Sequence, residues 1–140
     1  MTQPPPPCSA SWPATRAGAV LRVDLAALVR NYGHVAGLAQ GAACAAVVKA
    51  DAYGLGAAQV APVLEQAGAR EFFVAHVDEG LALRPYVSPQ ARITVLHGPR
   101  PDAVEACLAN GLRPVLNSLE QIGWVQAVAP QPGTVVAAGL

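Results

Sequence analysis

Short apolar runs recur along this chain at a regular interval. Their centres lie roughly 20 to 27 residues apart, a period that suits a repeated supersecondary unit. Each run is continuous rather than alternating and is flanked by turn residues, which is typical of strands buried on both faces of a parallel sheet. The expected strands are residues 45–48, 72–75, 93–96, 114–116 and 134–137.

The segments between these runs have helical spacing. Val60, Leu64 and Ala67 share one helix face after the first strand, and Gly68 follows them as a stop signal. Capping and helix-breaking residues mark the remaining helices. These are Asp24 at a leading helix, Asp78 with Pro85, Pro101 with Asp102, Asn110 with Gly111, and a capping box at residues 118–121.

Alternating strands and helices predict a parallel sheet with right-handed crossovers. Either an open doubly wound sheet or the front half of a (β/α)8 barrel fits, although a whole barrel needs about 250 residues. The sequence stops inside the fifth expected strand, with no closing helix. We therefore expect an α/β fold that is a partial (β/α)8 TIM-like barrel of about four βα units plus the start of a fifth strand. It occupies residues 19–140, behind a flexible Pro-rich leader at residues 1–18.

Composition narrows the choice of partners. Hydrophobic residues make up 53% of the chain, charged residues 13%, and the formal net charge is zero. No run of basic residues favours nucleic acid or an anionic membrane, and neither a secretory signal nor an apolar span is present. The three cysteines lack zinc-ligand spacing, so no metal site is expected. These features predict a cytoplasmic protein with reduced thiols.

Lys49 is the only lysine among the 140 residues and ends the first apolar run. Functional groups in parallel α/β folds gather at the carboxyl edge of the strands, which is where Lys49 is expected. Partial burial there favours the neutral, nucleophilic amine that a Schiff base requires. The alternative is a lysine that extends its charge out of the barrel mouth into solvent.

The residues after Lys49 favour a chemical role. Tyr53 places a phenol near the amine, and Gly54 and Gly56 form a turn before a helix, a setting that suits a phosphate. Ala-Ala-Gln follows this G-x-G, so a dinucleotide fingerprint fails at its third glycine. Amine, phenol and anion site together suggest a phosphorylated aldehyde cofactor. Asp51 is expected to fix the turn.

Five segments resemble the bacterial alanine racemases. The segment AVVKADAYGLG at 46–56 is close to their cofactor-lysine motif, VVKA(D/N)AYGHG, with Leu55 in place of the usual histidine. The others are RVDLAALVRNY at 22–32, FFVAHVDEGLALR at 72–84, ITVLHG at 93–98 and RPVLNSLEQI at 113–122.

The resemblance implies a barrel followed by a β-rich domain, acting as a homodimer with pyridoxal 5'-phosphate. It implies interconversion of L- and D-alanine for peptidoglycan precursors, through an external aldimine and two-base proton transfer. Lys49 is then the cofactor-bearing residue and one base, Tyr53 contacts the cofactor phosphate, and Leu96 contacts the pyridine ring. The family's second base and main phosphate loops have no counterpart in these residues, so we expect this chain to be inactive alone.

Other interpretations stay open. The chain could be a non-enzymatic fragment of an interrupted gene or a single-domain pyridoxal-phosphate-binding homeostasis protein, although Tyr53 and Gly54 speak against the latter. A nucleotide-binding sheet is a more distant alternative, and serine or broad-specificity racemases share the lysine motif. Four further polar residues have expected places: His76 and His97 at the barrel mouth, Asp78 as a helix cap, and Glu79 exposed to solvent.

Overall fold

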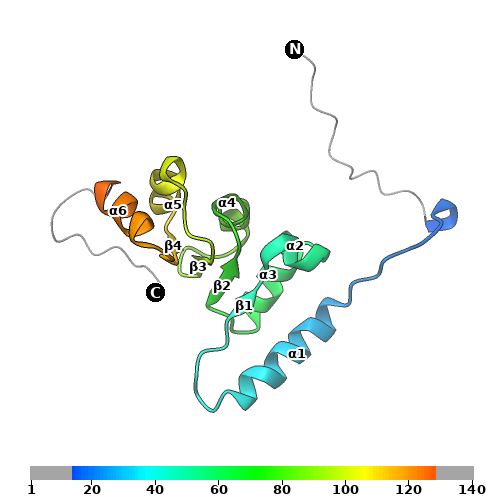
Figure 1. The fold of residues 1–140 in the computed structure, drawn as a ribbon. Helices are drawn as coiled ribbons and strands as arrows, with labels where there is room; N and C mark the ends of the chain where they lie inside the picture. Colours follow the sequence, from blue (N-terminus) through cyan, green and yellow to red (C-terminus); the bar gives the residue numbers. More distant parts are fainter. Residues whose placement is uncertain (1–13, 129–140) are drawn as a thin grey trace.

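The computed structural model describes residues 14–128 (Figure 1). Its four strands are β1 (Ala46–Val47), β2 (Glu71–Val74), β3 (Arg92–Val95) and β4 (Leu112–Pro114). The helical segments are α1 (Leu25–Leu38), α2 (Lys49–Gly54), α3 (Ala57–Gln66), α4 (Val77–Leu83), α5 (Val104–Ala109) and α6 (Leu119–Val128). Short 3-10 turns cover Ala14–Arg16, Arg84–Tyr86 and Pro101–Ala103.

The four strands form one parallel sheet in the order β1-β2-β3-β4. Phe72 on β2 lies between Ala46 on β1 and Ile93 on β3, and Ile93 in turn lies beside Leu112 on β4. A doubly wound sheet reverses its strand order at a switch point, whereas this order follows the chain without reversal. The order therefore favours the front half of a barrel over the open sheet.

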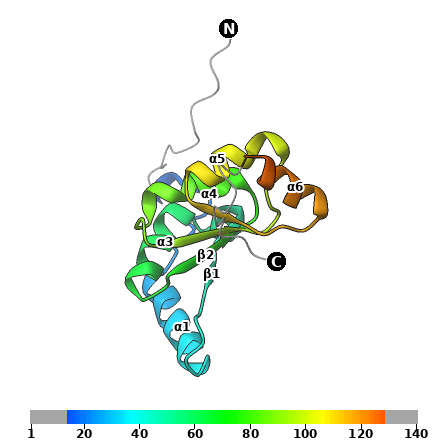
Figure 2. The ribbon, with the colours of Figure 1, turned by 90° about the vertical axis from the view of Figure 1, so that its left-hand side faces the viewer.

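The helices pack on one face of the sheet (Figures 1 and 2). Side chains alternate along a strand, and those of Phe72, Val74, Ile93 and Val95 are all buried on the helical side. They form one cluster with helix residues, among them Val60, Leu64, Val77, Leu83 and Cys107. The hydrophobic core thus lies between the sheet and a single layer of helices.

The opposite face of the sheet carries a polar network near the start of the strands. The Glu71 carboxylate accepts hydrogen bonds from Arg92 at 3.1 Å and from the Thr94 hydroxyl at 3.3 Å. It also pairs with Arg113 at 3.6 Å, so one carboxylate joins three neighbouring strands. In a closed barrel this face lines the interior.

Most of the secondary structure predicted from the sequence is confirmed. Four of the five expected strands form, although β2 and β3 begin one residue earlier than expected and β4 begins two residues earlier. The fifth, at 134–137, lies outside the described residues. The Asp24 carboxylate caps α1 by accepting from the Ala27 amide at 3.0 Å. Of the predicted leader at 1–18, residues 1–13 also lie outside the described part, and Ala14–Arg16 forms a 3-10 turn. No helix of the described part is long and apolar enough to cross a bilayer.

The predicted caps of the later helices are partly wrong. His76, not Asp78, is the N-cap residue of α4, and no side chain caps that helix. Asp78 lies one residue inside the first turn, where its charge favours the helix dipole without an N-cap hydrogen bond. In α6 the Ser118 hydroxyl accepts from the Gln121 amide at 3.3 Å, as in a capping box. The Gln121 side chain, however, binds the Asn117 amide and the His97 carbonyl instead of Ser118.

Because the Cys107 thiol is buried, we expect the free energy of unfolding to depend on pH. Burial raises its pKa from 9.0 to about 11. Between these values the unfolded chain loses the thiol proton while the folded chain keeps it, so stability is full below pH 9 and falls as pH rises toward 11. Urea unfolding at about pH 8 and about pH 10 should show this loss in wild type, with a smaller one in Cys107→Ala. An equal loss in both proteins would contradict the assignment.

Candidate functional site

Lys49 lies at the carboxyl edge of the sheet, directly after β1. Val48, the residue before it, is 2% exposed in the core, and its amide donates to the Phe73 carbonyl at 2.9 Å. Lys49 itself is half-buried, and no ion pair involves it among residues 14–128. Hydrogen bonding to β2 thus fixes the backbone up to Val48, and Lys49 is the next residue.

The turn after Lys49 is left-handed. Ala50, Asp51, Ala52 and Tyr53 have φ between 51° and 57° and ψ between 36° and 49°, so α2 is a left-handed turn rather than an α-helix. Such a conformation costs L-residues about 1–2 kcal/mol each, and none of the four is glycine. The sequence predicted a strand-to-helix turn here but not its handedness. Backbone strain of this kind persists only where surrounding contacts enforce it, and it is concentrated at functional sites.

Asp51 is one of the residues that enforce the turn. Its carboxylate accepts a hydrogen bond from the Ala57 amide at 2.7 Å, and its carbonyl accepts one from the Gly56 amide at 2.9 Å. The Ala52 amide closes the other side of the turn by donating to the Val48 carbonyl at 2.9 Å. The prediction that Asp51 fixes the turn beside Lys49 is confirmed.

The same contact argues against a phosphate site at this turn. Ala57 is the first residue of α3, so the Asp51 carboxylate occupies the helix N-terminus where an anion would bind. A phosphate there would meet a carboxylate of like charge. Gly54 and Gly56 have φ of 82° and 91°, a conformation that glycine adopts without the steric cost of a side chain.

The other predicted site residues lie at the same edge of the fold. Tyr53 is 64% exposed at the end of the left-handed turn. Leu96 follows β3 and is half-buried, and its amide donates to the Val74 carbonyl at 2.9 Å. Leu55, at the position of the family's usual histidine, packs against the hydrophobic core. Lys49 and Leu96 are thus separated along the edge by the intervening strand β2.

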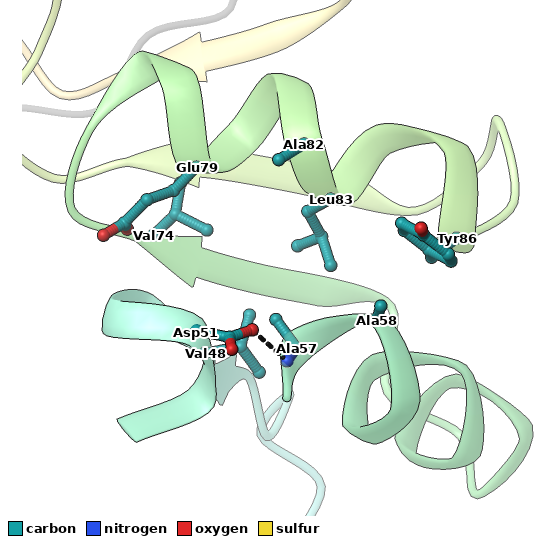
Figure 3. A pocket seen from close by; sticks show the side chains of 9 residues that line it. All are labelled: Val48, Asp51, Ala57, Ala58, Val74, Glu79, Ala82, Leu83 and Tyr86. Carbon is teal, nitrogen blue, oxygen red and sulfur yellow. Dashed lines mark hydrogen bonds between the residues drawn. The ribbon is translucent and has the colours of Figure 1, made fainter. Parts of the chain in front are cut away.

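Glu79 is not the exposed residue that the sequence predicted. It is half-buried, and its carboxylate accepts from the Ala50 amide at 3.1 Å and from the Ala75 amide at 2.7 Å. It lines a groove of about 400 Å³ between α4 and the α2–α3 segment, opposite Asp51 (Figure 3). Its spacing from Ala50 is 29 residues, so no local sequence signal could have revealed this contact.

The two histidines predicted at the barrel mouth lie next to each other. The His76 and His97 rings are 4.8 Å apart between centroids and tilted by 47°, and both residues are exposed. The Gln121 side chain donates to the His97 carbonyl at 2.8 Å and so ties α6 to this edge. Within the described part of the chain, no group of three or more His, Cys, Asp or Glu residues could hold a metal.

The residues at this edge fit part of the cofactor that the resemblance implies. A half-buried amine without an ion-pair partner in the described chain fits a carbonyl-bearing group. Tyr53 is exposed four residues after Lys49, so its hydroxyl is accessible as a hydrogen-bond donor. The N-terminus of α3 does not fit the phosphate, because Asp51 already occupies it.

Comparisons with known proteins identify the family and the fold of this chain. Residues 23–140 match the family described as "Alanine racemase, N-terminal domain". An alanine racemase from Brucella ovis is 50% identical over 117 residues, which are 84% of this chain. The crystal structure of alanine racemase from Bartonella henselae with covalently bound pyridoxal phosphate is 41% identical, with a TM-score of 0.73 over 76% of this chain. A histidine racemase from Leuconostoc mesenteroides is 26% identical, with a TM-score of 0.69 over 78% of this chain.

These matches confirm the partial barrel predicted from the sequence. The chain spans 30% of the length of the Brucella relative and 30% of the Bartonella chain. The family match begins at residue 23, so it includes the sheet, its helices and the turn after Lys49. The chain belongs to the alanine racemase N-terminal domain family.

Proposed function

We propose that this chain supplies the lysine-bearing part of a pyridoxal-phosphate-dependent alanine racemase. The observation that carries the proposal is Lys49, the only lysine of the chain, half-buried at the carboxyl edge of the sheet before a strained left-handed turn. A nucleophilic amine on a fixed backbone is what covalent capture of an aldehyde requires. The covalently bound cofactor in the Bartonella henselae structure supports the same assignment.

Each predicted site residue has a proposed role. Lys49 Nζ would hold the cofactor through its carbonyl carbon, with the carbonyl oxygen leaving as water that takes both amine hydrogens. Once the substrate amine displaces it, the Lys49 amine would move a proton at the substrate α-carbon. The Tyr53 hydroxyl would donate a hydrogen bond to the cofactor phosphate, and Leu96 would pack against the pyridine ring. When bound, the cofactor accepts the electron pair left by loss of that proton. Because proton loss and return on opposite faces invert the centre, a second base facing Lys49 is needed.

The proposal extends to the organisation of the whole protein. Residues 19–140 form the first half of a cofactor-binding barrel, and the rest of the barrel, a β-rich domain and a second subunit complete the site. The chain covers 30% of the relatives' length and offers one lysine, so we expect the 140 residues alone not to racemise alanine. We place the protein in the cytoplasm, with neither nucleic acid nor membrane as a partner.

Borohydride reduction of the full-length protein with pyridoxal 5'-phosphate tests this function. We expect a reduced pyridoxyl label at Lys49, located by peptide mass spectrometry, because reduction makes the lysine–cofactor bond permanent. Lys49→Arg keeps the charge but lacks a nucleophilic amine, so it should give no label at this position and no conversion of L-alanine to D-alanine.

Two results would count against the proposal. If Lys49 carries no label in the full-length protein, it is not the residue that binds the cofactor. Labelling without racemisation of alanine leaves the cofactor site but changes the substrate, and the histidine racemase among the structural relatives makes histidine the first alternative to assay.

A further inference from the structure

The Glu79 carboxylate joins the ends of two strands. One oxygen accepts from the Ala50 amide at 3.1 Å, next to Lys49, and the other accepts from the Ala75 amide at 2.7 Å, just after β2. We propose that Glu79 is a positioning residue for Lys49, holding the peptide bond that follows the lysine against the end of β2. This inference rests on the function proposed above, in which Lys49 binds the cofactor.

The Ala50 amide controls the direction of the lysine because of peptide planarity. The Ala50 N–H lies in the same rigid plane as the Cα and carbonyl of Lys49. A fixed hydrogen bond to that N–H therefore sets the ψ angle of Lys49 and, with it, the start of the left-handed turn. Ala50 is the first of the four residues with positive φ, so Glu79 acts where the strained conformation begins.

Glu79 is the carboxylate that connects this turn to the sheet. Asp51 also holds the turn, but its carboxylate binds Ala57 at the start of α3 and not a strand. Both bonds are charge-assisted because their acceptor is a carboxylate, and such bonds are stronger than neutral ones. The two carboxylates thus act differently. Asp51 links the turn to the start of α3, and Glu79 links the turn to the end of β2.

Asp78 is a matched control on the same turn of the same helix. It is exposed and makes no side-chain hydrogen bond or ion pair within residues 14–128. Asp78→Asn and Glu79→Gln each remove one negative charge from the first turn of α4. A difference between the two variants therefore reports the bridge between Ala50 and Ala75, not the loss of charge near the helix N-terminus.

The experiment compares both variants in the full-length protein without added cofactor. Amide hydrogen exchange should be about tenfold faster at Ala50 or at Ala75 in Glu79→Gln, because the glutamine side chain keeps one acceptor oxygen and turns an N–H donor toward the other backbone N–H. Exchange in the core strands, for example at Ile93, should stay unchanged. Asp78→Asn should leave all these rates within about twofold of wild type. Equal, uniform acceleration throughout Glu79→Gln would indicate general destabilisation and would overturn the positioning role.

Labelling of Lys49 provides the second readout. The rate of borohydride-trapped labelling with pyridoxal 5'-phosphate should fall about tenfold in Glu79→Gln and stay unchanged in Asp78→Asn. If Glu79→Gln does not fold, Glu79→Asp keeps the charge on a side chain one methylene shorter and should show a smaller change of the same kind. Labelling at wild-type rate in a folded Glu79 variant refutes the positioning role while leaving Lys49 as the cofactor residue. Failure of wild type to label Lys49 refutes the proposed function, and the local exchange at Ala50 and Ala75 still decides whether Glu79 holds the turn.

Discussion

Replacing Gly98 by alanine should lower the free energy of unfolding by about 3 kcal/mol. Gly98 follows β3 with a φ of +67°, and an added Cβ would lie 2.5 Å from the Val115 carbonyl oxygen. That oxygen belongs to the backbone after β4, which pairs with β3, so it cannot move away without breaking the sheet. The Gln121 side chain, within 2.8 Å of the same position, would also have to give up its bond to His97. Urea denaturation of Gly98→Ala measures the loss.

Gly111→Ala is the control for the backbone conformation alone. Gly111 has a φ of +64°, nearly that of Gly98, but nothing lies within 4 Å of an added Cβ. Its substitution should therefore cost only the left-handed conformation, about 1 kcal/mol. The difference between the two variants isolates the collision with Val115. Equal losses would show that the loop after β3 relaxes and that β4 does not restrain it.

Phe72→Ala should have the largest effect on stability among the core substitutions, about 4 kcal/mol. Phe72 is 0% exposed in the second of the four strands and has the largest fully buried side chain. It lies between Ala46 and Ile93 and faces the helical layer, so truncation leaves a cavity that neighbours on both sides cannot fill. Thermal and urea unfolding of this chain measure the loss.

Phe73→Ala is the matched variant, because the two phenylalanines are adjacent and point to opposite faces. Phe73 is half-buried on the face without helices, so its truncation in this chain should cost no more than about 2 kcal/mol. Losses of the same size in both variants would contradict a core confined to the helical side.

The secondary structure and the position of Lys49 at the end of a strand could be predicted from the sequence because their causes are local. Apolar runs predicted the four observed strands to within two residues, although helices cover one face of this sheet and the expected burial on both faces was wrong. Asp24 could be assigned as a cap from its position just before an apolar helix face, because a capping bond spans only three residues. Lys49 stood out as the only lysine at the end of a buried run.

Tertiary structure alone decided how that site is held. The sequence Ala-Asp-Ala-Tyr favours no left-handed turn, and its conformation depends on contacts from Val48, Asp51 and Glu79. The Gly54–Gly56 turn suggested a phosphate site. In the structure, however, the first amide of α3, that of Ala57, donates to the Asp51 carboxylate.

Glu79 shows the same limit most clearly. In sequence it is an acidic residue in the first turn of a short helix, where solvent exposure is the ordinary expectation. It reaches Ala50 only because β1 and β2 pair in parallel, which brings the ends of both strands to one edge of the sheet. Local patterns determine which residues form strands and caps, whereas contacts between distant residues depend on strand order and register, and those are settled only when the whole sheet packs.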